Sequence, residues 1–321
     1  MTKKELEELI PVFLSQYESQ RPTTKKERER TVRNFVSFLP EGEAEITLQT
    51  YEEWLNSQQI RKRTENVRIA KLCQFIRFCR FYGLVAPIPV NKIVQDDYVP
   101  HLYSEEEMNA IIETADNIAS CSIAASNKEF CMPLLIRLLA FSGMRLGECL
   151  SIRIDQIDTE DLVIRLTETK NSRERIVPLH ESFRRILIPY TKKLAKLYPD
   201  GKFLFPQDDG MRPITKNQTE YEFSKILRKT GIRGKTDKFE RGACLHCFRH
   251  TFAVRSFREA VKRGVSVETS VPYLSFYLGH VRFTETEKYL KFSSDIMPEN
   301  TERFAEFIGD LFGEGQENEG Q

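Results

Sequence analysis

A proline-bearing stretch in the first third of the chain constrains its fold more than any other feature. Between Gly83 and Pro100 the sequence also carries Pro87 and Pro89. Proline interrupts helices because it lacks a backbone N–H and clashes with the preceding turn. We therefore expect a linker over residues 85–103 with a separate domain on each side, and 321 residues supply enough chain for two hydrophobic cores.

The first domain, residues 1–84, is predicted to be entirely helical. Apolar spacing and breaking residues place its helices near 3–19, 24–38, 47–58 and 62–82. The second domain, residues 104–313, is predicted to be mostly helical as well, and its first helix begins with a capping box from Ser104 to Glu107. Short strands are expected near 162–166, 174–178 and 203–205, the first two joined as a hairpin. The fold class is thus mainly α with a small β-hairpin or sheet (α+β).

The second domain carries a set of polar residues suited to breaking a phosphodiester covalently. Two arginines could grip the non-bridging phosphate oxygens, because a guanidinium stays charged and binds such oxygens bidentately. A tyrosine could attack the phosphorus if other groups accept its proton and protonate the leaving oxygen. The candidates are Arg145, Lys170, His246, Arg249, His280 and Tyr289.

Each of these residues also has an ordinary structural explanation. Lys170 lies in a polar turn between two strand-like segments, where an exposed lysine is common. Tyr289 competes with Tyr273 and Tyr277, which belong to an aromatic, apolar run that we expect to pack in the core. The ordered occurrence of all six residues favours a single site.

Four sequence segments closely resemble the motif series of the tyrosine recombinases, also called phage-type integrases: GMRLGE, TKNSRERIVPL, HCFRHTFA and YLGHVRFTETEKYL. The resemblance implies that Arg145 and Arg249 hold the scissile phosphate, that Tyr289 attacks it, and that Lys170 protonates the 5′-oxygen. His246 and His280 would orient phosphate oxygens and assist proton transfer, and Glu148 would support the site from behind. A 3′-phosphotyrosyl intermediate, strand exchange through a Holliday junction and chemistry without metal or ATP are implied too.

The family resemblance also implies partners. They are double-stranded DNA, gripped by two domains as a clamp, and three further copies of the chain in a synaptic tetramer, with room for accessory DNA-bending proteins. The apolar stripe formed by Phe304, Phe307, Ile308, Leu311 and Phe312 predicts a helix that packs on its own domain or docks on a neighbouring protomer. Residues 314–321 are expected to be disordered. The alternatives are an enzyme like type IB topoisomerases or resolvases, and a non-catalytic DNA-binding regulator.

The net charge of +1 hides a basic first domain. Residues 61–80 hold seven basic side chains against one acidic side chain, and residues 21–33 hold six against two. A solvated helix face would explain either cluster alone. Together with the catalytic pattern, they predict contacts with the DNA backbone from Lys25, Lys26, Arg28, Arg61, Lys62, Arg63, Arg68 and Lys71.

Cysteine usage and hydropathy predict a cytoplasmic protein. The seven cysteines are scattered and do not form a secreted disulfide pattern, and no apolar run is long enough to span a membrane. The pair Cys244 and Cys247, with His250, could supply half of a zinc site. Because no second close Cys/His pair would complete that site, we predict no metal.

Overall fold

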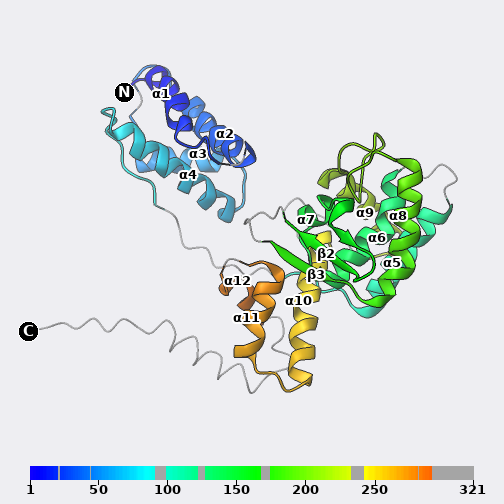
Figure 1. The fold of residues 1–321 in the computed structure, drawn as a ribbon. Coiled ribbons are helices and arrows are strands. Elements are labelled where there is room, and N and C mark those ends of the chain that lie inside the picture. The colour runs from blue at the N-terminus through cyan, green and yellow to red at the C-terminus, as the bar shows by residue number, and fades with distance from the viewer. Residues whose placement is uncertain are drawn as a thin grey trace, which may run out of the picture. The chain divides into compact units, whose positions relative to one another are not determined.

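A computed structural model describes residues 1–20, 22–43, 45–90, 99–121, 127–167, 174–232, 242–280 and 282–290. The chain divides into two compact units, Met1–Tyr98 (unit 1) and Val99–Gln321 (unit 2), and Figure 1 shows the elements of each. This division falls inside the segment predicted as a linker. The roles assigned above to the two domains stay predictions.

Unit 1 consists of four helices around one apolar core. They are α1 (Lys3–Ser15), α2 (Pro22–Phe38), α3 (Leu48–Ser57) and α4 (Lys62–Arg80). Trp54 is fully buried, and its indole N–H donates to Asn34 Oδ1 at 2.9 Å. All four predicted helices are present, but α2 begins at Pro22 and not after it. Proline suits the first helical position because the N–H it lacks has no partner there.

Unit 2 is built around α6, whose apolar residues are buried around most of the helix, with Phe141 exposed near its end. This helix contacts α5, α9 and α10. The Ser104–Glu107 capping box predicted for the start of α5 is present. The helices of unit 2 are α5 (Glu105–Cys121), α6 (Asn127–Ser142), α7 (Leu146–Leu150), α8 (Arg184–Leu197), α9 (Lys216–Thr230), α10 (Leu245–Lys262), α11 (Val267–Leu278) and α12 (Thr284–Glu287), with 3₁₀ turns at Ile154–Gln156 and Glu181–Phe183.

A small antiparallel sheet completes unit 2. Its strands lie in the order β1 (Ile157–Asp158), β2 (Val163–Leu166) and β3 (Arg175–Pro178), and Ile164 pairs with Val177. The two predicted hairpin strands and the mainly helical fold class are confirmed. The strand predicted near 203–205 is wrong, because Phe203 forms only an isolated bridge with Arg153.

Two glycines end helices at the centre of unit 2. Gly143 follows α6 with φ of 61°, and Gly279 follows α11 with φ of 66°. A Cβ at Gly143 would lie 2.5 Å from Phe252 Cδ1, and one at Gly279 would lie 2.8 Å from Arg175 Nη1. Both positions therefore require glycine for backbone conformation and for space.

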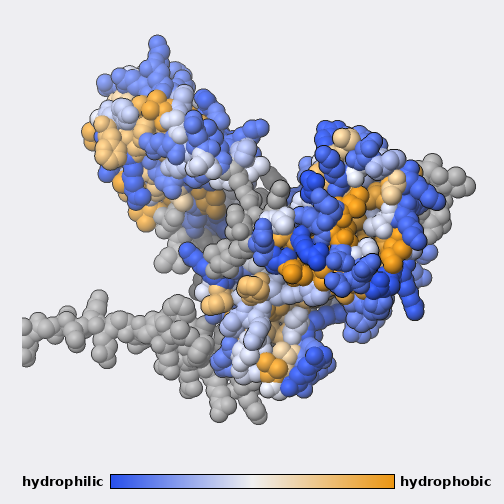
Figure 2. All heavy atoms as spheres, viewed as in Figure 1, coloured by the Kyte–Doolittle hydropathy of each residue, from blue (hydrophilic) through white to orange (hydrophobic). Residues whose placement is uncertain are grey.

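The face of the molecule drawn in Figure 2 is largely hydrophilic, with smaller hydrophobic patches. Tyr273 is 75% exposed on α11, so the prediction that it packs in the core is wrong. Tyr277, one turn later, is half-buried and stacks on Phe252 at 5.6 Å between ring centroids. Among the helices of the described ranges, none combines the length and apolarity needed to cross a bilayer.

Candidate active site

Arg249 forms the buried centre of the site. It lies one turn into α10, is 2% exposed, and donates from Nη1 to the Gly143 carbonyl and from Nη2 to the Leu278 carbonyl, both at 2.8 Å. These acceptors lie at the C-terminal ends of α6 and α11, where carbonyls carry partial negative charge. Burial and the nearby Arg145 charge lower the pKa of Arg249 to about 10, so its guanidinium stays charged at neutral pH.

Arg145 binds the C-terminal end of α11, which Arg249 also binds. It caps α7, and its Nη1 and Nη2 both donate to the Gly279 carbonyl at 3.2 Å. Its Nη1 also donates to Glu148 Oε1 at 3.0 Å. The end of α11 is thus the shared mount of Arg145 and Arg249, although 104 residues of chain separate them. The structure brings the two predicted clamp residues together.

Glu148 binds a third arginine that the sequence analysis did not select. Arg175, at the start of β3, donates from Nη2 to Glu148 Oε2 at 2.7 Å, and both side chains are nearly inaccessible to solvent. Burial alone would raise the pKa of Glu148. Hydrogen bonds and charge from Arg175, and then hydrogen bonds from Arg145, outweigh burial and hold that pKa at about 2. Three guanidiniums against one carboxylate leave an excess of positive charge that suits an anion.

His280 has a defined tautomer in this site. Its Nε2 lies 2.8 Å from Arg249 Nη2, and because arginine can only donate, Nε2 must accept. The proton therefore resides on Nδ1, which donates to Thr286 Oγ1 at 2.6 Å. Burial and then the charges of Arg249 and Arg145 lower the pKa of His280 to about 3. The ring is neutral at physiological pH.

Tyr289 lies next to Arg249 and His280 of the same chain. Arg249 belongs, with Arg145 and Arg175, to a group of three arginines, the arginine cage. The Tyr289 side chain is 5% exposed, and its ring stacks on His280 at 6.1 Å and tilts against His250 at 5.4 Å between centroids. Burial raises the pKa of the phenol, while the charge of Arg249 and a hydrogen bond with it act in the opposite direction. Apolar residues of α10 and α11 enclose the rest of the ring. The predicted nucleophile and the predicted clamp are neighbours.

His246 marks the outer edge of the site. It is exposed in the first turn of α10, and its ring contacts His250 at 4.6 Å between centroids. Loss of solvation and the charges of Arg249 and Arg145 lower the pKa of His246. Lys170 lies outside the described residues. The next strand along the chain, β3, begins at Arg175, which is part of the site.

The basic residues predicted to bind DNA in unit 1 differ in exposure. Lys26, Lys62 and Arg63 are exposed, whereas Lys25, Arg61, Arg68 and Lys71 are half-buried. Arg28 is 7% exposed, lies 3.8 Å above the Tyr17 ring and donates to Gln74 Oε1. Its position favours a role in holding unit 1 together.

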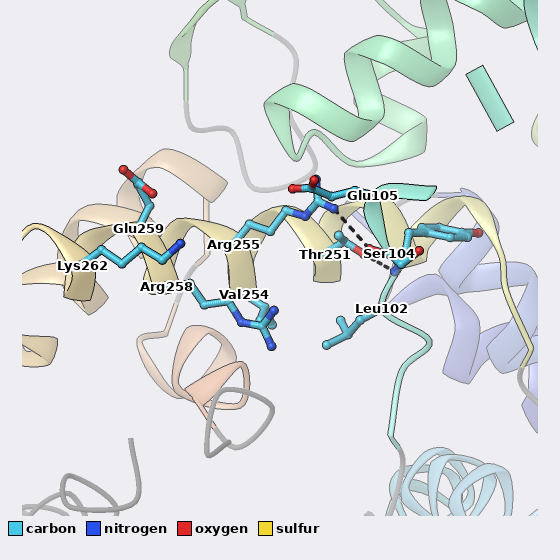
Figure 3. A pocket seen from close by; sticks show the side chains of 10 residues that line it. Leu102, Ser104, Glu105, Thr251, Val254, Arg255, Arg258, Glu259 and Lys262 are labelled. Atoms are coloured by element: carbon cyan, nitrogen blue, oxygen red, sulfur yellow. Dashed lines mark hydrogen bonds between the residues drawn. The ribbon is translucent and has the colours of Figure 1, made fainter. Parts of the chain in front are cut away.

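A pocket lies farther along α10, and Figure 3 shows the residues that line it, Leu102, Ser104, Arg255 and Lys262 among them. The backbone N–H of Tyr103 donates there to Thr251 Oγ1 at 2.9 Å, which fastens the start of unit 2 to α10. None of the six predicted catalytic residues lines this pocket. Within the described ranges, no cluster of three or more His, Cys, Asp or Glu side chains could hold a metal ion, so Cys244, Cys247 and His250 form no such cluster.

Comparison with known proteins adds three findings. The model of the phage integrase family matches residues 102–294, a range that contains all six predicted catalytic residues. The tyrosine recombinase XerC of Staphylococcus carnosus is 26% identical over 76% of this chain and 76% of its own length, and the tyrosine recombinase XerA of Saccharolobus solfataricus is 25% identical over 80% and 78%. The crystal structure of a lambda integrase tetramer bound to a Holliday junction superposes with a TM-score of 0.64 at 15% identity, covering 88% of this chain and 76% of that one.

Proposed function

Because this chain belongs to the phage integrase family and is a tyrosine-type site-specific DNA recombinase, we propose that Tyr289 is the nucleophile that cleaves DNA through a 3′-phosphotyrosyl intermediate. The observation that carries the assignment is the contact of the buried Tyr289 phenol with Arg249, inside the arginine cage of its own chain.

The two clamp arginines would bind the non-bridging oxygens of the scissile phosphate. Arg145 donates from Nη1 to Glu148 and to the Gly279 carbonyl, and from Nη2 to the Gly279 carbonyl. Its Nε–H has no hydrogen-bond acceptor among the described residues. Nε and Nη2 together present the edge of the guanidinium that binds phosphate bidentately. Arg249 is oriented by three acceptors. Both cations are therefore positioned before DNA arrives, which is the arrangement that stabilises charge developing in a transition state.

The remaining groups would accept the proton of Tyr289 and protonate the leaving 5′-oxygen. Burial keeps the pKa of Tyr289 raised, so the free enzyme holds the phenol protonated. As the phenolic oxygen forms its bond to phosphorus, the proton would leave with the help of His246, which its lowered pKa keeps neutral. The P–O5′ bond would break, and Lys170 would give its proton to the departing 5′-oxygen. His280, held as the Nδ1–H tautomer, would orient Arg249.

The partners follow from the same chemistry. We propose double-stranded DNA as the substrate and a synaptic tetramer as the active assembly, supported by the similarity of this chain to a lambda integrase that forms a tetramer on a Holliday junction. Residues 1–84 would be the core-binding domain, 85–103 the linker and 104–313 the catalytic domain, the two closing on DNA as a clamp. The predicted terminal helix that contains Phe304 to Phe312 and the tail beyond it lie outside the described residues.

A nicked suicide substrate tests the nucleophile. On such DNA the cleaved strand diffuses away, so the covalent protein–DNA adduct accumulates and can be seen on a denaturing gel. We expect Tyr289→Phe to form no adduct, because it removes only the attacking oxygen. Tyr277→Phe is the matched control, since Tyr277 is a half-buried tyrosine that packs on Phe252 in the same unit. An adduct that persists in Tyr289→Phe would reject the assignment.

A further inference from the structure

Two cysteines meet at the start of α10. Cys244 is the residue that precedes the helix, Cys247 lies in its first turn, and their sulfurs are 3.4 Å apart. Cys244 is exposed and Cys247 is fully buried. The pair therefore combines one accessible thiol with one protected thiol. To form a disulfide, the two sulfurs would have to approach from 3.4 Å to about 2.05 Å.

The surroundings of Cys244 favour its thiolate. Its sulfur lies at the N-terminus of α10, within hydrogen-bond distance of the Cys247 sulfur at 3.4 Å. The pairing of the two thiols lowers the pKa of Cys244 and raises the pKa of Cys247. Open N–H groups at a helix N-terminus stabilise negative charge. The Cys244 sulfur is thus suited to attack an external disulfide first, and the Cys247 sulfur is suited to attack Cys244 afterwards.

We propose that Cys244 and Cys247 form a redox-active dithiol that reacts with low-molecular-weight disulfides such as glutathione disulfide. The Cys244 thiolate attacks one sulfur of that disulfide, forming a mixed disulfide and releasing one thiolate, which takes up a proton. Cys247 then loses its proton and attacks Cys244 Sγ, which expels the second small thiol. Two S–H groups of the protein are oxidised to one S–S bond, and one external disulfide is reduced to two thiols.

The two cysteines flank one residue of the proposed active site in the sequence and precede another. His246 lies between the two cysteines in the sequence, and Arg249 lies two residues after Cys247 on the same helix. The Tyr103 hydroxyl donates to the Cys244 carbonyl at 3.0 Å, which ties the pair to the first segment of unit 2. Drawing the sulfurs together would tighten this turn and shift the His246 ring. The inference that oxidation slows DNA cleavage rests on the proposed function; disulfide formation itself does not.

The thiol chemistry is tested on the full chain in glutathione redox buffers, with alkylation of free thiols and peptide mass spectrometry. In the wild-type protein we expect the Cys244–Cys247 disulfide to form before the other cysteines react. Cys247→Ser should stop at a mixed disulfide of Cys244 with glutathione, and Cys244→Ser should form neither. Cys73→Ser is the control, because Cys73 is a half-buried thiol in unit 1. Reaction of Cys244 no faster than Cys73, or Cys247 that stays reduced throughout, would overturn the proposal.

The coupling to cleavage is tested with the suicide substrate. Oxidised wild-type protein should form adduct about 10- to 100-fold more slowly, the loss expected from a catalytic group displaced by about 1 Å. Dithiothreitol should restore the rate, and Cys244→Ser should be insensitive to oxidant. A disulfide that forms without changing the rate would overturn the coupling and leave the dithiol established. Failure of the proposed function would look different, because the reduced wild-type protein would form no adduct at all.

Discussion

The cationic side chains at the start of α4 in unit 1 and those of the candidate site in unit 2 differ in exposure. In unit 1, Lys62 and Arg63 are exposed in the first turn of α4, where they suit an extended polyanion that arrives from outside. In unit 2, Arg175 and Arg249 are almost fully buried. A buried charge is tolerated only when acceptors surround it. Unit 2 therefore contains its own acceptors, and its arginines are fixed for one compact anion.

The strongest test of this contrast replaces Arg249 with lysine. Lysine keeps the charge but cannot reproduce the planar fork that reaches the Gly143 and Leu278 carbonyls together. We expect Arg249→Lys to slow adduct formation by about 10²- to 10³-fold, the loss typical for one misplaced charge-stabilising donor. Single-turnover cleavage of the suicide substrate measures it. Arg63→Lys in unit 1 is the control and should leave the rate near that of the wild type; equal losses in both variants would erase the contrast.

The sequence predicted which polar residues form this site better than it predicted the backbone groups that hold them in place. Arg145, Arg249, His280 and Tyr289 were selected because their types and order fit phosphoryl chemistry, and the structure brings them together. The shared mount was not predictable, since it consists of carbonyls at the end of α11, which every residue possesses. Only a fold that turns the chain at Gly279 aims those carbonyls at two distant arginines.

Arg175 shows the same limit from the other direction. It lies in a segment with several basic residues, so nothing in the pattern separates it from its neighbours. A single signal was present, a charged residue that opens a short apolar strand. Its partner Glu148 was chosen by resemblance, yet the pairing of the two became evident only when α7 and β3 were placed in three dimensions. Helix spans were easier, because periodicity depends on local sequence alone.

Removing Arg175 should have the next largest effect. Within the described part of the chain its side-chain hydrogen bonds go to Glu148, so it acts on Arg145 by holding the Glu148 carboxylate that Arg145 also binds. We expect Arg175→Gln to slow adduct formation by about 10- to 100-fold through misplacement of Arg145. Affinity for uncleaved DNA should stay unchanged. Arg175→Lys, which can still pair with one carboxylate oxygen, should recover part of the rate. If loss of activity only parallels loss of folded protein in thermal melts, a positioning role is excluded.

Acidification should weaken unit 2 before unit 1, because buried neutral histidines are confined to the site. His280 has a pKa of about 3 in the folded protein, against about 6.5 in an unfolded chain. The unfolded state therefore binds the proton more readily, so this stability is complete above pH 6.5 and is lost as the pH falls toward 3. Between pH 7 and pH 5 we expect a loss of about 2 kcal/mol from this residue. Denaturant unfolding of wild type and His280→Asn measures it, and Glu148 does not interfere because its window lies below pH 4.5.

The smallest effect separates two cations within unit 1. Lys62 is exposed, whereas Arg28 is buried over the Tyr17 ring. If Lys62 meets a phosphate, Lys62→Ala should reduce the slope of log affinity against log salt by about 0.9, which amounts to a few-fold change in affinity at physiological salt. Arg28→Met should leave that slope unchanged and instead destabilise unit 1 by about 1 to 2 kcal/mol through the lost cation–π contact. Fluorescence anisotropy across a salt series, paired with melting of each variant, distinguishes the two. A reduced slope in Arg28→Met would show that a buried cation also reaches the DNA, and the division between exposed binding charges and buried structural charges would then fail inside unit 1 itself.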